Sequence, residues 1–377
     1  MIKVQRICNL TDLENVKNDW EDLLIRSGNK SIFMTWEWLI TWWEVYGGDY
    51  ELWWLVIRDQ GDKLIGSAPL YLRKQRNGLF FPHRELRFVG TGAPVAPEHL
   101  DVIIDSKEKE ETLQAISNYL ALHSSDWDVL YFSDISDPNA AAYLLSKSLS
   151  KGGAVVVVDQ QVPLAPYVPL PNSWEEYFKS LGKWLRRTIA RQRNKQTREL
   201  DMSFHIWSPE NGELSSAFDK FEALYASRKE TMAVENKFEK ASGYRQFHRL
   251  LAKRFSEKGW FHLAFLKIGD QEVAAEYTFK YLDTLYSYQC GFDAAYGKNN
   301  VFKVLRSYVI ENAIQQGIKE FDLLRGEEPY KYDWGAITRE KKMIRCFSST
   351  SYGRILNSVL GLKRMTKKML QIKVMTQ

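Results

Sequence analysis

The residues from Phe321 to Trp334 combine a strand-like apolar run with a dense set of reactive side chains. Phe321-Asp322-Leu323-Leu324 ends at Arg325-Gly326, and charged and aromatic residues follow at once: Glu327, Glu328, Tyr330, Lys331, Tyr332, Asp333 and Trp334. In α/β proteins, binding and catalytic residues gather in the loops where strands end. We therefore expect a functional site at this strand end.

Asp322 is the first candidate for chemistry, because an ionised carboxylate among apolar neighbours is costly unless it is paired or hydrogen-bonded. It could accept the proton of an attacking amine, while Arg325 and Lys331 bind an anionic group of the substrate. Tyr330 and Trp334 would then pack on a sugar or another ring. The alternative is structural: Asp322 pairs with Arg325 or caps a turn, and the aromatic residues fill a surface between domains.

The elements that position this segment can be read from the spacing of apolar residues. Thr284–Phe292 reads as a strand, and residues at helical spacing predict a helix over Val301–Gln316, with Gly317 just past its end. Strand, loop, helix and strand thus follow one another as a βαβ-like unit. The loop before the helix, residues 294–300, leads to a helix N-terminus, which can bind a phosphate group through its backbone N–H groups.

These residues resemble a known family. The ordered set that carries the resemblance is Tyr288, Gly291, Asp293, Gly317, Asp322, Arg325-Gly326, Glu328, Tyr330-Lys331 and Trp334, together with an early segment, Phe33-Met34-Thr35-Trp36-Glu37-Trp38, followed by Trp42, Trp43 and Gly47. The set resembles the FemAB-like, or CelD-like, acyltransferases of the GNAT superfamily. The matching positions extend over nearly the whole chain.

The resemblance implies an α/β fold of mixed sheets with two tandem GNAT-like domains, and an N-acyltransferase without a metal. Acyl-CoA, such as acetyl-CoA, would be the donor, and a small-molecule amine the acceptor, for example an amino sugar or amino acid of an envelope or polysaccharide precursor. Asp322, or a water that it holds, would be the base. The substrate-binding residues would be Arg325, Glu328, Tyr330, Lys331, Trp334 and Tyr288, and the coenzyme-binding residues Lys298, Asn299, Asn300, Val301, Phe302 and Lys303.

One part of the chain departs from the family pattern. The family commonly has a Ser-Pro-Gly-like entry to the coenzyme helix, whereas this sequence has Asn299-Asn300-Val301. Asparagine can cap a helix, and Lys298 and Lys303 supply positive charge. The departure weakens the expectation of acyl-CoA binding and leaves two alternatives open: an aminoacyl-tRNA donor, as FemAB-like relatives use, or a non-catalytic assembly module.

Glu276 is a second candidate for the base. It lies within Val273-Ala274-Ala275-Glu276-Tyr277-Thr278-Phe279, where strand alternation places it on one face with Ala274 and Thr278. That face is directed either to solvent or to a cleft.

Composition sets outer bounds on the function. The chain has 377 residues, is 45% hydrophobic and carries a net charge of +5, which suits two ordinary domain cores. It has no run of about 18 apolar residues and no apolar leader at its start, so we expect a cytoplasmic protein. Three cysteines without short spacing, and six histidines without metal-ligand spacing, predict neither a disulfide framework nor a metal site.

The charge distribution divides the chain. Residues 1–172 hold 16 Lys and Arg against 23 Asp and Glu, whereas residues 173–377 hold 36 against 24. We predict an N-terminal domain (1–161), a Pro-rich linker (162–172), a catalytic domain (173–350) and a basic amphipathic C-terminal helix (351–377). The hairpin-like segments Gly61–Tyr71 and Gly269–Phe279 suggest that the two domains share a topology.

Two basic segments offer partners with negative charge. From Lys183 to Arg198 a helix carries a stripe of Arg187, Arg191, Lys195 and Arg198. The stripe could face nucleic-acid phosphates, a nucleotide-sugar diphosphate, an anionic lipid surface, the acidic first domain or only solvent. The C-terminal helix could lie on the inner face of the membrane or dock on its own domain.

Overall fold

The computed structural model describes residues 2–75, 82–137, 139–159, 163–199 and 201–361. The chain divides into two compact units, residues 1–162 with 341–377 and residues 163–340. The expected linker and the last expected domain boundary both differ from this division. Residues Ala165–Pro169 form a strand inside the sheet of the second unit, and the chain from residue 341 onward returns to the first unit.

The first unit is built on two sheets. One has the strand order β1-β3-β4-β7 and the other β2-β5-β6-β8-β17-β9. Its strands are β1 (Lys3–Ile7), β2 (Glu51–Leu52), β3 (Trp54–Arg58), β4 (Leu64–Ala68), β5 (Leu70–Gln75), β6 (His83–Phe88), β7 (Ile103–Ile104), β8 (Val129–Ile135), β9 (Val155–Asp159) and β17 (Lys342–Phe347). Its helices are α1 (Leu10–Glu14), α2 (Lys17–Ser27), α3 (Trp36–Tyr46), α4 (Lys109–Leu122) and α5 (Ala141–Lys151), with the short helices η1 (Ile32–Met34) and η2 (Gly47–Asp49).

The return of the chain to the first unit is fixed by a buried cation. Lys341 is 1% exposed and forms ion pairs with Glu98 and, at 2.8 Å, with Asp134. β17 then inserts between β8 and β9 as an antiparallel partner of both. Leu356, in the helical segment 351–361, packs against Val129 of β8. The remainder of the predicted amphipathic helix, residues 362–377, lies outside the described residues.

The second unit is one seven-stranded sheet, in the order β11-β12-β13-β14-β15-β10-β16. Its strands are β10 (Ala165–Pro169), β11 (Met202–Ile206), β12 (Phe261–Ile268), β13 (Gln271–Tyr281), β14 (Thr284–Phe292), β15 (Glu320–Asp322) and β16 (Ile337–Arg339). Its helices are α6 (Trp174–Ser180), α7 (Lys183–Glu199), α8 (Leu214–Thr231), α9 (Lys237–Lys240), α10 (Tyr244–Glu257), α11 (Val301–Gln315) and α12 (Pro329–Asp333), with η3 (Pro209–Asn211) and η4 (Ala294–Asn299).

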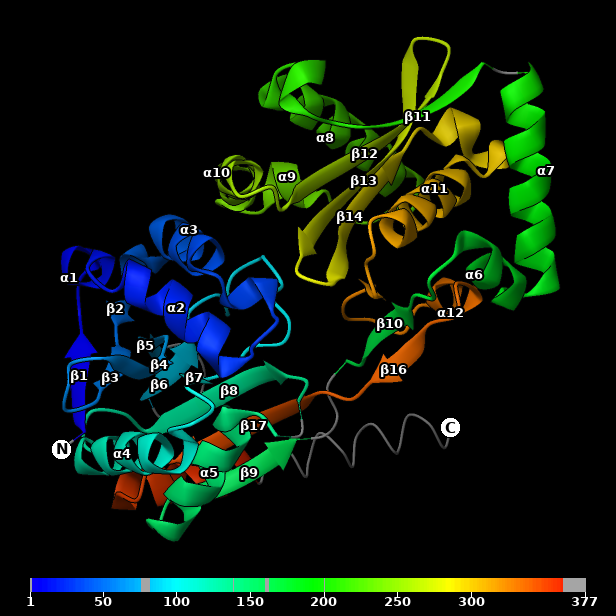
Figure 1. Ribbon diagram of the computed structural model, residues 1–377. Helices are drawn as coiled ribbons and strands as arrows, with labels where there is room; N and C mark the ends of the chain where they lie inside the picture. Colours follow the sequence, from blue (N-terminus) through cyan, green and yellow to red (C-terminus); the bar gives the residue numbers. More distant parts are fainter. Residues whose placement is uncertain (1, 76–81, 138, 160–162, 200, 362–377) are drawn as a thin grey trace. The chain divides into compact units, whose positions relative to one another are not determined.

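Helices cover both faces of this sheet. Figure 1 shows α11 on one side of β12, β13 and β14, and α8, α9 and α10 on the other, in agreement with the contacts of α11 and α8 with β13. Strand alternation explains the two layers: Ala274 belongs to the core under α11, whereas Tyr277 packs against Phe218 and Phe221 of α8. β14 lies at the centre and carries residues toward both layers.

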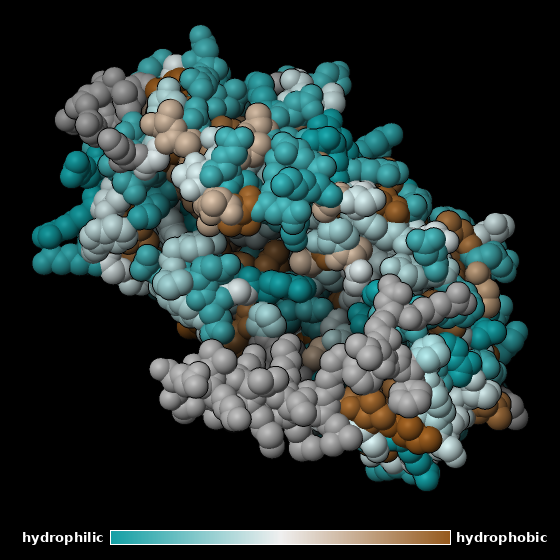
Figure 2. Space-filling model, turned by 180° about the vertical axis from the view of Figure 1, so that it is seen from behind, coloured by the Kyte–Doolittle hydropathy of each residue, from teal (hydrophilic) through white to brown (hydrophobic). Residues whose placement is uncertain are grey.

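Most large apolar side chains are buried in the cores of the two units. The face seen in Figure 2 is mostly hydrophilic, with apolar residues in separate patches. None of the helices in the described part of the chain has the length and hydropathy needed to span a bilayer.

Candidate functional site

The centre of the candidate site is the point where β14 and β15 part. The two strands are parallel and their ladder has three residue pairs, from Thr284↔Glu320 to Tyr286↔Asp322. Beyond Asp322 the chain follows β10 instead, through a bond of 3.0 Å from the Leu323 N–H to the Pro166 carbonyl. β14 continues to Phe292. The carboxyl ends of two parallel strands are thereby separated, which is the kind of position where α/β sheets bind ligands.

A β-bulge lies just beyond this point. The pairing of β13 with β14 passes from Thr278↔Ser287 to Tyr277↔Gln289, so Tyr288 is the extra residue. Bulges re-aim side chains and often lie beside active sites. The Tyr288 ring packs near His248 of α10, at 5.2 Å between centroids. The bulge therefore directs this predicted substrate-binding residue toward the α8, α9 and α10 layer.

On the other face, Glu276 and Arg306 form a buried polar cluster. Glu276 Oε1 accepts bonds from Arg306 Nη2 at 2.7 Å, from Arg306 Nε at 3.1 Å and from the Ser287 hydroxyl at 2.7 Å. Both charged side chains are at most 2% exposed. Burial lowers the pKa of Arg306, but the neighbouring groups, Glu276 first among them, together hold that pKa above its ordinary value. Glu276 thus faces α11 rather than solvent, and it lies one strand from the bulge.

Arg306 also brings a predicted substrate residue to this cluster. Its guanidinium lies 4.6 Å from the ring centre of Phe302 and 5.6 Å from that of Tyr330. Tyr330 is 39% exposed, and burial raises the pKa of its phenol against the opposing effect of Arg306. Glu276, Phe302 and Tyr330, which are far apart in sequence, therefore meet around one arginine that the sequence analysis did not select. The available signal was a lone arginine within the apolar pattern of its helix.

Asp322 accepts hydrogen bonds from a backbone amide and from an arginine. Its Oδ1 accepts a bond of 2.7 Å from the Leu324 N–H, and its Oδ2 accepts one of 3.1 Å from Arg339. Leu324 has a φ of 56°, a left-handed conformation that costs a branched side chain energy and needs such support. The turn-capping alternative therefore describes the position of Asp322, and Arg339 is an ion-pair partner of its carboxylate.

Lys331 supports the same turn. It is 4% exposed, and its Nζ donates to the carbonyls of Leu324, Arg325 and Gly326 at 3.1, 2.8 and 3.0 Å, while Glu328 lies 3.0 Å away. Burial lowers the pKa of Lys331 against the opposing effect of Glu328. An ammonium group has three donors, so this geometry favours a role in holding the turn over the predicted contact with a substrate anion.

The remaining predicted substrate residues divide between core and surface. Trp334 is 3% exposed, belongs to the hydrophobic core, and its carbonyl accepts a bond of 2.9 Å from the Tyr177 hydroxyl. It is a packing residue in this structure. Arg325 is partly exposed and lies near Lys237 of α9. Burial, and then the positive charge of Arg325, lower the pKa of Lys237.

The predicted coenzyme residues lie at the N-terminus of α11. Asn300, with a φ of 52°, joins η4 to the helix, and the Val304 N–H bonds to its carbonyl, so the N–H groups of residues 301–303 belong to the first helical turn. Val301 is buried, and its side chain belongs to the hydrophobic core. Lys303 lies 4.1 Å from the ring centre of Trp184 in α7. Asn299 ends η4, and the side chain of Lys298 lies outside the description.

Only some of the basic residues of helix α7 are exposed. Arg193 packs α7 onto α11: its Nη1 bonds to Glu311 at 2.7 Å and its Nε to the Ser307 hydroxyl at 2.9 Å. Arg187 and Arg191 are exposed, whereas the side chains of Lys195 and Arg198 lie outside the described residues. Among the residues that the structure describes, no group of His, Cys, Asp and Glu is arranged to hold a metal.

The sequence of the second unit matches a known protein family. Residues 184–332 match the family model described as "Acetyltransferase (GNAT) domain". Residues 184–332 therefore contain a GNAT acetyltransferase domain, and the predicted transferase class and mixed α/β fold are confirmed. No protein of curated function matches it in sequence.

Three solved structures illustrate the particular fold. FemX has a TM-score of 0.64 at 8% identity, over 95% of this chain and 99% of its own. L-PGS from Bacillus licheniformis has 0.53 at 12%, over 88% and 92%. The C-terminal domain of a putative lysylphosphatidylglycerol synthetase from Agrobacterium fabrum has 0.52 at 9%, over 94% and 96%. At these identities the likeness shows the fold alone, and it extends over both units.

Proposed function

We propose that this protein transfers an acyl group from acyl-CoA to the amine of a small molecule, such as an amino sugar or amino acid of an envelope or polysaccharide precursor. One observation supports this most directly: the end of the β14–β15 ladder at Tyr286 and the bulge at Tyr288 follow one another along β14, whose last residue, Phe292, contacts Phe302 in the first turn of α11. The extended pantetheine arm of an acyl-CoA can lie along β14 there, with the pyrophosphate of the coenzyme at the helix.

The donor would be held mainly by backbone groups. The first-turn N–H groups of α11 and its dipole favour a pyrophosphate, and Lys303 adds a positive charge beside them. Phe302, which packs against Phe292, offers apolar surface to the pantetheine chain. Val301 would contribute its N–H and not its side chain.

The chemistry needs no covalent enzyme intermediate. The amine nitrogen attacks the thioester carbonyl and forms the C–N bond, the C–S bond breaks, and the thiolate of CoA leaves and takes up a proton. The enzyme must position the two reactants and accept the proton that the amine loses. Buried Cys290 is unsuited to attack, because burial raises the pKa of its thiol.

Glu276 is better placed than Asp322 to receive that proton, directly or through water. Both oxygens of Asp322 are engaged by the turn and by Arg339. Glu276 Oε2 has no hydrogen-bond partner among the described residues, and the bond from Ser287 ties the carboxylate to the strand that carries the bulge. In this proposal Arg306 orients Glu276, and Asp322 shapes the turn beside it.

The acceptor would carry an anionic group. Four partly buried cations gather on the α8 and α9 side of β14. They are Arg228, Lys229, Lys237 and Arg325. Burial and then the neighbouring Arg228 lower the pKa of Lys229, so the cluster is close enough for mutual repulsion. A carboxylate or phosphate of the acceptor would relieve that repulsion.

An aminoacyl-tRNA donor is the second candidate. It is favoured by the fold shared with FemX and with a putative lysylphosphatidylglycerol synthetase, a name that denotes transfer of an aminoacyl group. Exposed Arg187 and Arg191 on α7, together with Lys303 beside Trp184, would meet RNA phosphates near the same helix N-terminus.

Ligand-induced stabilisation separates these proposals. The purified protein is heated with acetyl-CoA, longer acyl-CoAs, free CoA or bulk aminoacyl-tRNA at low and moderate salt. A ligand at a hundred times its Kd stabilises the native state by about 2.7 kcal/mol. Stabilisation by an acyl-CoA that persists at moderate salt supports the first proposal. Stabilisation by aminoacyl-tRNA alone, lost with salt, favours the second. No stabilisation by either contradicts both and favours a non-catalytic module.

A further inference from the structure

The second unit has a cavity of about 420 Å³ on its α8 face, away from the end of β14. It lies over β11, the edge strand of the sheet, and β12, with β13 between these strands and β14. Its size is within the range of small-ligand pockets, roughly 300–1,000 Å³. None of the residues considered in the acyl-transfer proposal lines it.

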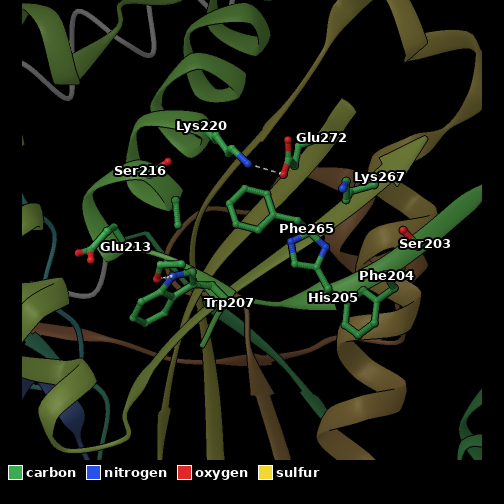
Figure 3. Close-up of a pocket in the computed structure, with 12 residues that line it drawn as sticks. Ser203, Phe204, His205, Trp207, Glu213, Ser216, Lys220, Phe265, Lys267 and Glu272 are labelled. Atoms are coloured by element: carbon green, nitrogen blue, oxygen red, sulfur yellow. Dashed lines mark hydrogen bonds and ion pairs between the residues drawn. The ribbon is translucent and has the colours of Figure 1, made fainter. Parts of the chain in front are cut away.

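Aromatic rings form part of the pocket wall. His205 stacks on Phe265 with 5.3 Å between ring centres and 18° between planes, and Trp207 lies beside them in Figure 3. The indole N–H of Trp207 donates a bond of 3.1 Å to the Gly212 carbonyl, which fixes the ring orientation. Fixed aromatic faces suit a ligand with an apolar surface of its own.

The charges around the pocket balance. Lys220 and Lys267 are matched by Glu213 and Glu272, and Lys220 bonds to Glu272 at 2.7 Å. Burial lowers the pKa of His205, so this imidazole adds no charge near pH 7. Because the pocket has no net charge, it does not attract a phosphate or another strong anion electrostatically, in contrast to the cation cluster beside β14.

The polar groups surround the pocket rather than line one edge of it. Figure 3 shows Lys220 and Glu272 reaching toward one another on one side, Lys267 and Ser203 on the next, Glu213 near Trp207, and Ser216 between Glu213 and Lys220. A nucleobase presents its donors and acceptors in its plane along defined edges. A sugar ring has an apolar C–H face and hydroxyl groups that project all around it, and charged side chains can bond to adjacent hydroxyls.

We propose that this pocket is a carbohydrate-binding site that is separate from the acyl-transfer site. The sugar ring would lie against the rings of Trp207 and His205, and Lys220, Glu272 and Lys267 would bond to its hydroxyls. The ligand is a neutral mono- or oligosaccharide. Because β11 is an edge strand, a longer glycan can extend past the pocket without displacing another strand.

Binding is tested on the full chain by ligand-observed NMR and by calorimetry. The probes are mono- to tetrasaccharides of glucose and N-acetylglucosamine, compared with inorganic phosphate, adenosine and glycine. We expect saturable binding of a saccharide and none of the other three. Trp207→Ala should weaken that binding at least tenfold, and Trp207→Phe, which keeps an aromatic face, should weaken it less.

Two further variants keep the test independent of folding. His205→Ala leaves the Trp207 to Gly212 bond in place and should also weaken saccharide binding, whereas Lys253→Ala, at an exposed position of α10 outside the pocket, should leave the affinity within twofold. Thermal unfolding of each variant identifies any that fail to fold. The proposal is overturned if folded protein binds no saccharide, if His205→Ala and Trp207→Phe bind it as the parent does, or if adenosine or phosphate competes for the pocket.

Discussion

The carboxylate of Glu276 and the guanidinium of Arg306 meet at 2.7 Å in the interior of the second unit, with both side chains at most 2% exposed. β13 supplies the acid and α11 supplies the base. Their pairing therefore ties a central strand to the helix whose N-terminus is the proposed donor site.

Removing one partner of this pair should destabilise the protein strongly. Arg306→Met leaves an unpaired buried carboxylate, and Glu276→Leu leaves an unpaired buried cation, so each should cost about 3–5 kcal/mol in the free energy of unfolding. The double variant should lose less than the sum of the two, because no unpaired charge remains. Urea unfolding measures all three. Additive losses would show that the two side chains do not stabilise each other.

Asp322→Asn distinguishes the two candidate bases. Asparagine keeps an oxygen for the Leu324 N–H, so the turn should persist with a loss of about 1–2 kcal/mol from the weakened contact with Arg339. With Glu276 as the base, kcat should fall less than tenfold in Asp322→Asn and at least a hundredfold in Glu276→Gln, which retains an oxygen for Ser287. The matched control is circular dichroism of both variants. A folded but inactive Asp322→Asn would return the catalytic role to Asp322.

His248 should make the protein acid-sensitive. It is fully buried in an aromatic cluster, and burial, with a smaller effect of Lys237, lowers its pKa from 6.5 to about 3. The unfolded state therefore binds a proton below pH 6.5 that the folded state excludes, so this stability is complete above pH 6.5 and is lost as the pH falls toward 3. From pH 7 to pH 5 the loss from this residue is about 2 kcal/mol.

His248→Phe tests that assignment, because phenylalanine suits the surrounding rings and does not titrate. Its unfolding free energy should fall by about 2 kcal/mol less than that of the parent between pH 7 and pH 5. His262, whose pKa burial lowers to about 4, supplies a remaining slope in both proteins. Parallel pH profiles of parent and variant would contradict the assignment.

Gly291 should be intolerant of a side chain. A Cβ there would lie 2.3 Å from the backbone nitrogen of Tyr225 and 2.5 Å from the carbonyl carbon of Leu224, so β14 or α8 would have to move. We expect Gly291→Ala to cost about 2–3 kcal/mol. Gly297→Ala is the control, because a Cβ there meets nothing within 4 Å. Equal melting temperatures for the two variants would be incompatible with the close approach of α8 to β14.

Much of the fold was predictable, because local patterns determine it. The predicted strand Thr284–Phe292 has the bounds found for β14, and the helix predicted over Val301–Gln316 is α11 within one residue. Both predicted hairpins exist, as β3–β4 and β12–β13. Apolar periodicity and turn residues act over a few positions, so a single sequence reveals them.

The candidate site was predictable only in part. The sequence located the segment around Asp322 and the entry to α11, and it selected Glu276 as a carboxylate inside a strand. It missed Arg306, and it assigned substrate contacts to Lys331 and Trp334, which the structure uses for a turn and for the core. Burial and partner choice depend on residues distant along the chain, such as Arg339 for Asp322.

By itself, the sequence determined the order of strands and helices, the FemAB-like motif set and the basic character of residues 173–377. Tertiary structure alone decided that residues after 340 return to the first unit, where Lys341 pairs with Glu98 and β17 joins β8. It also decided which of the charged residues face one another around β14. The physical reason is the distance along the sequence over which each effect acts. Backbone propensity and periodicity depend on neighbouring residues, whereas ion pairing and desolvation depend on which distant segments the fold brings into contact.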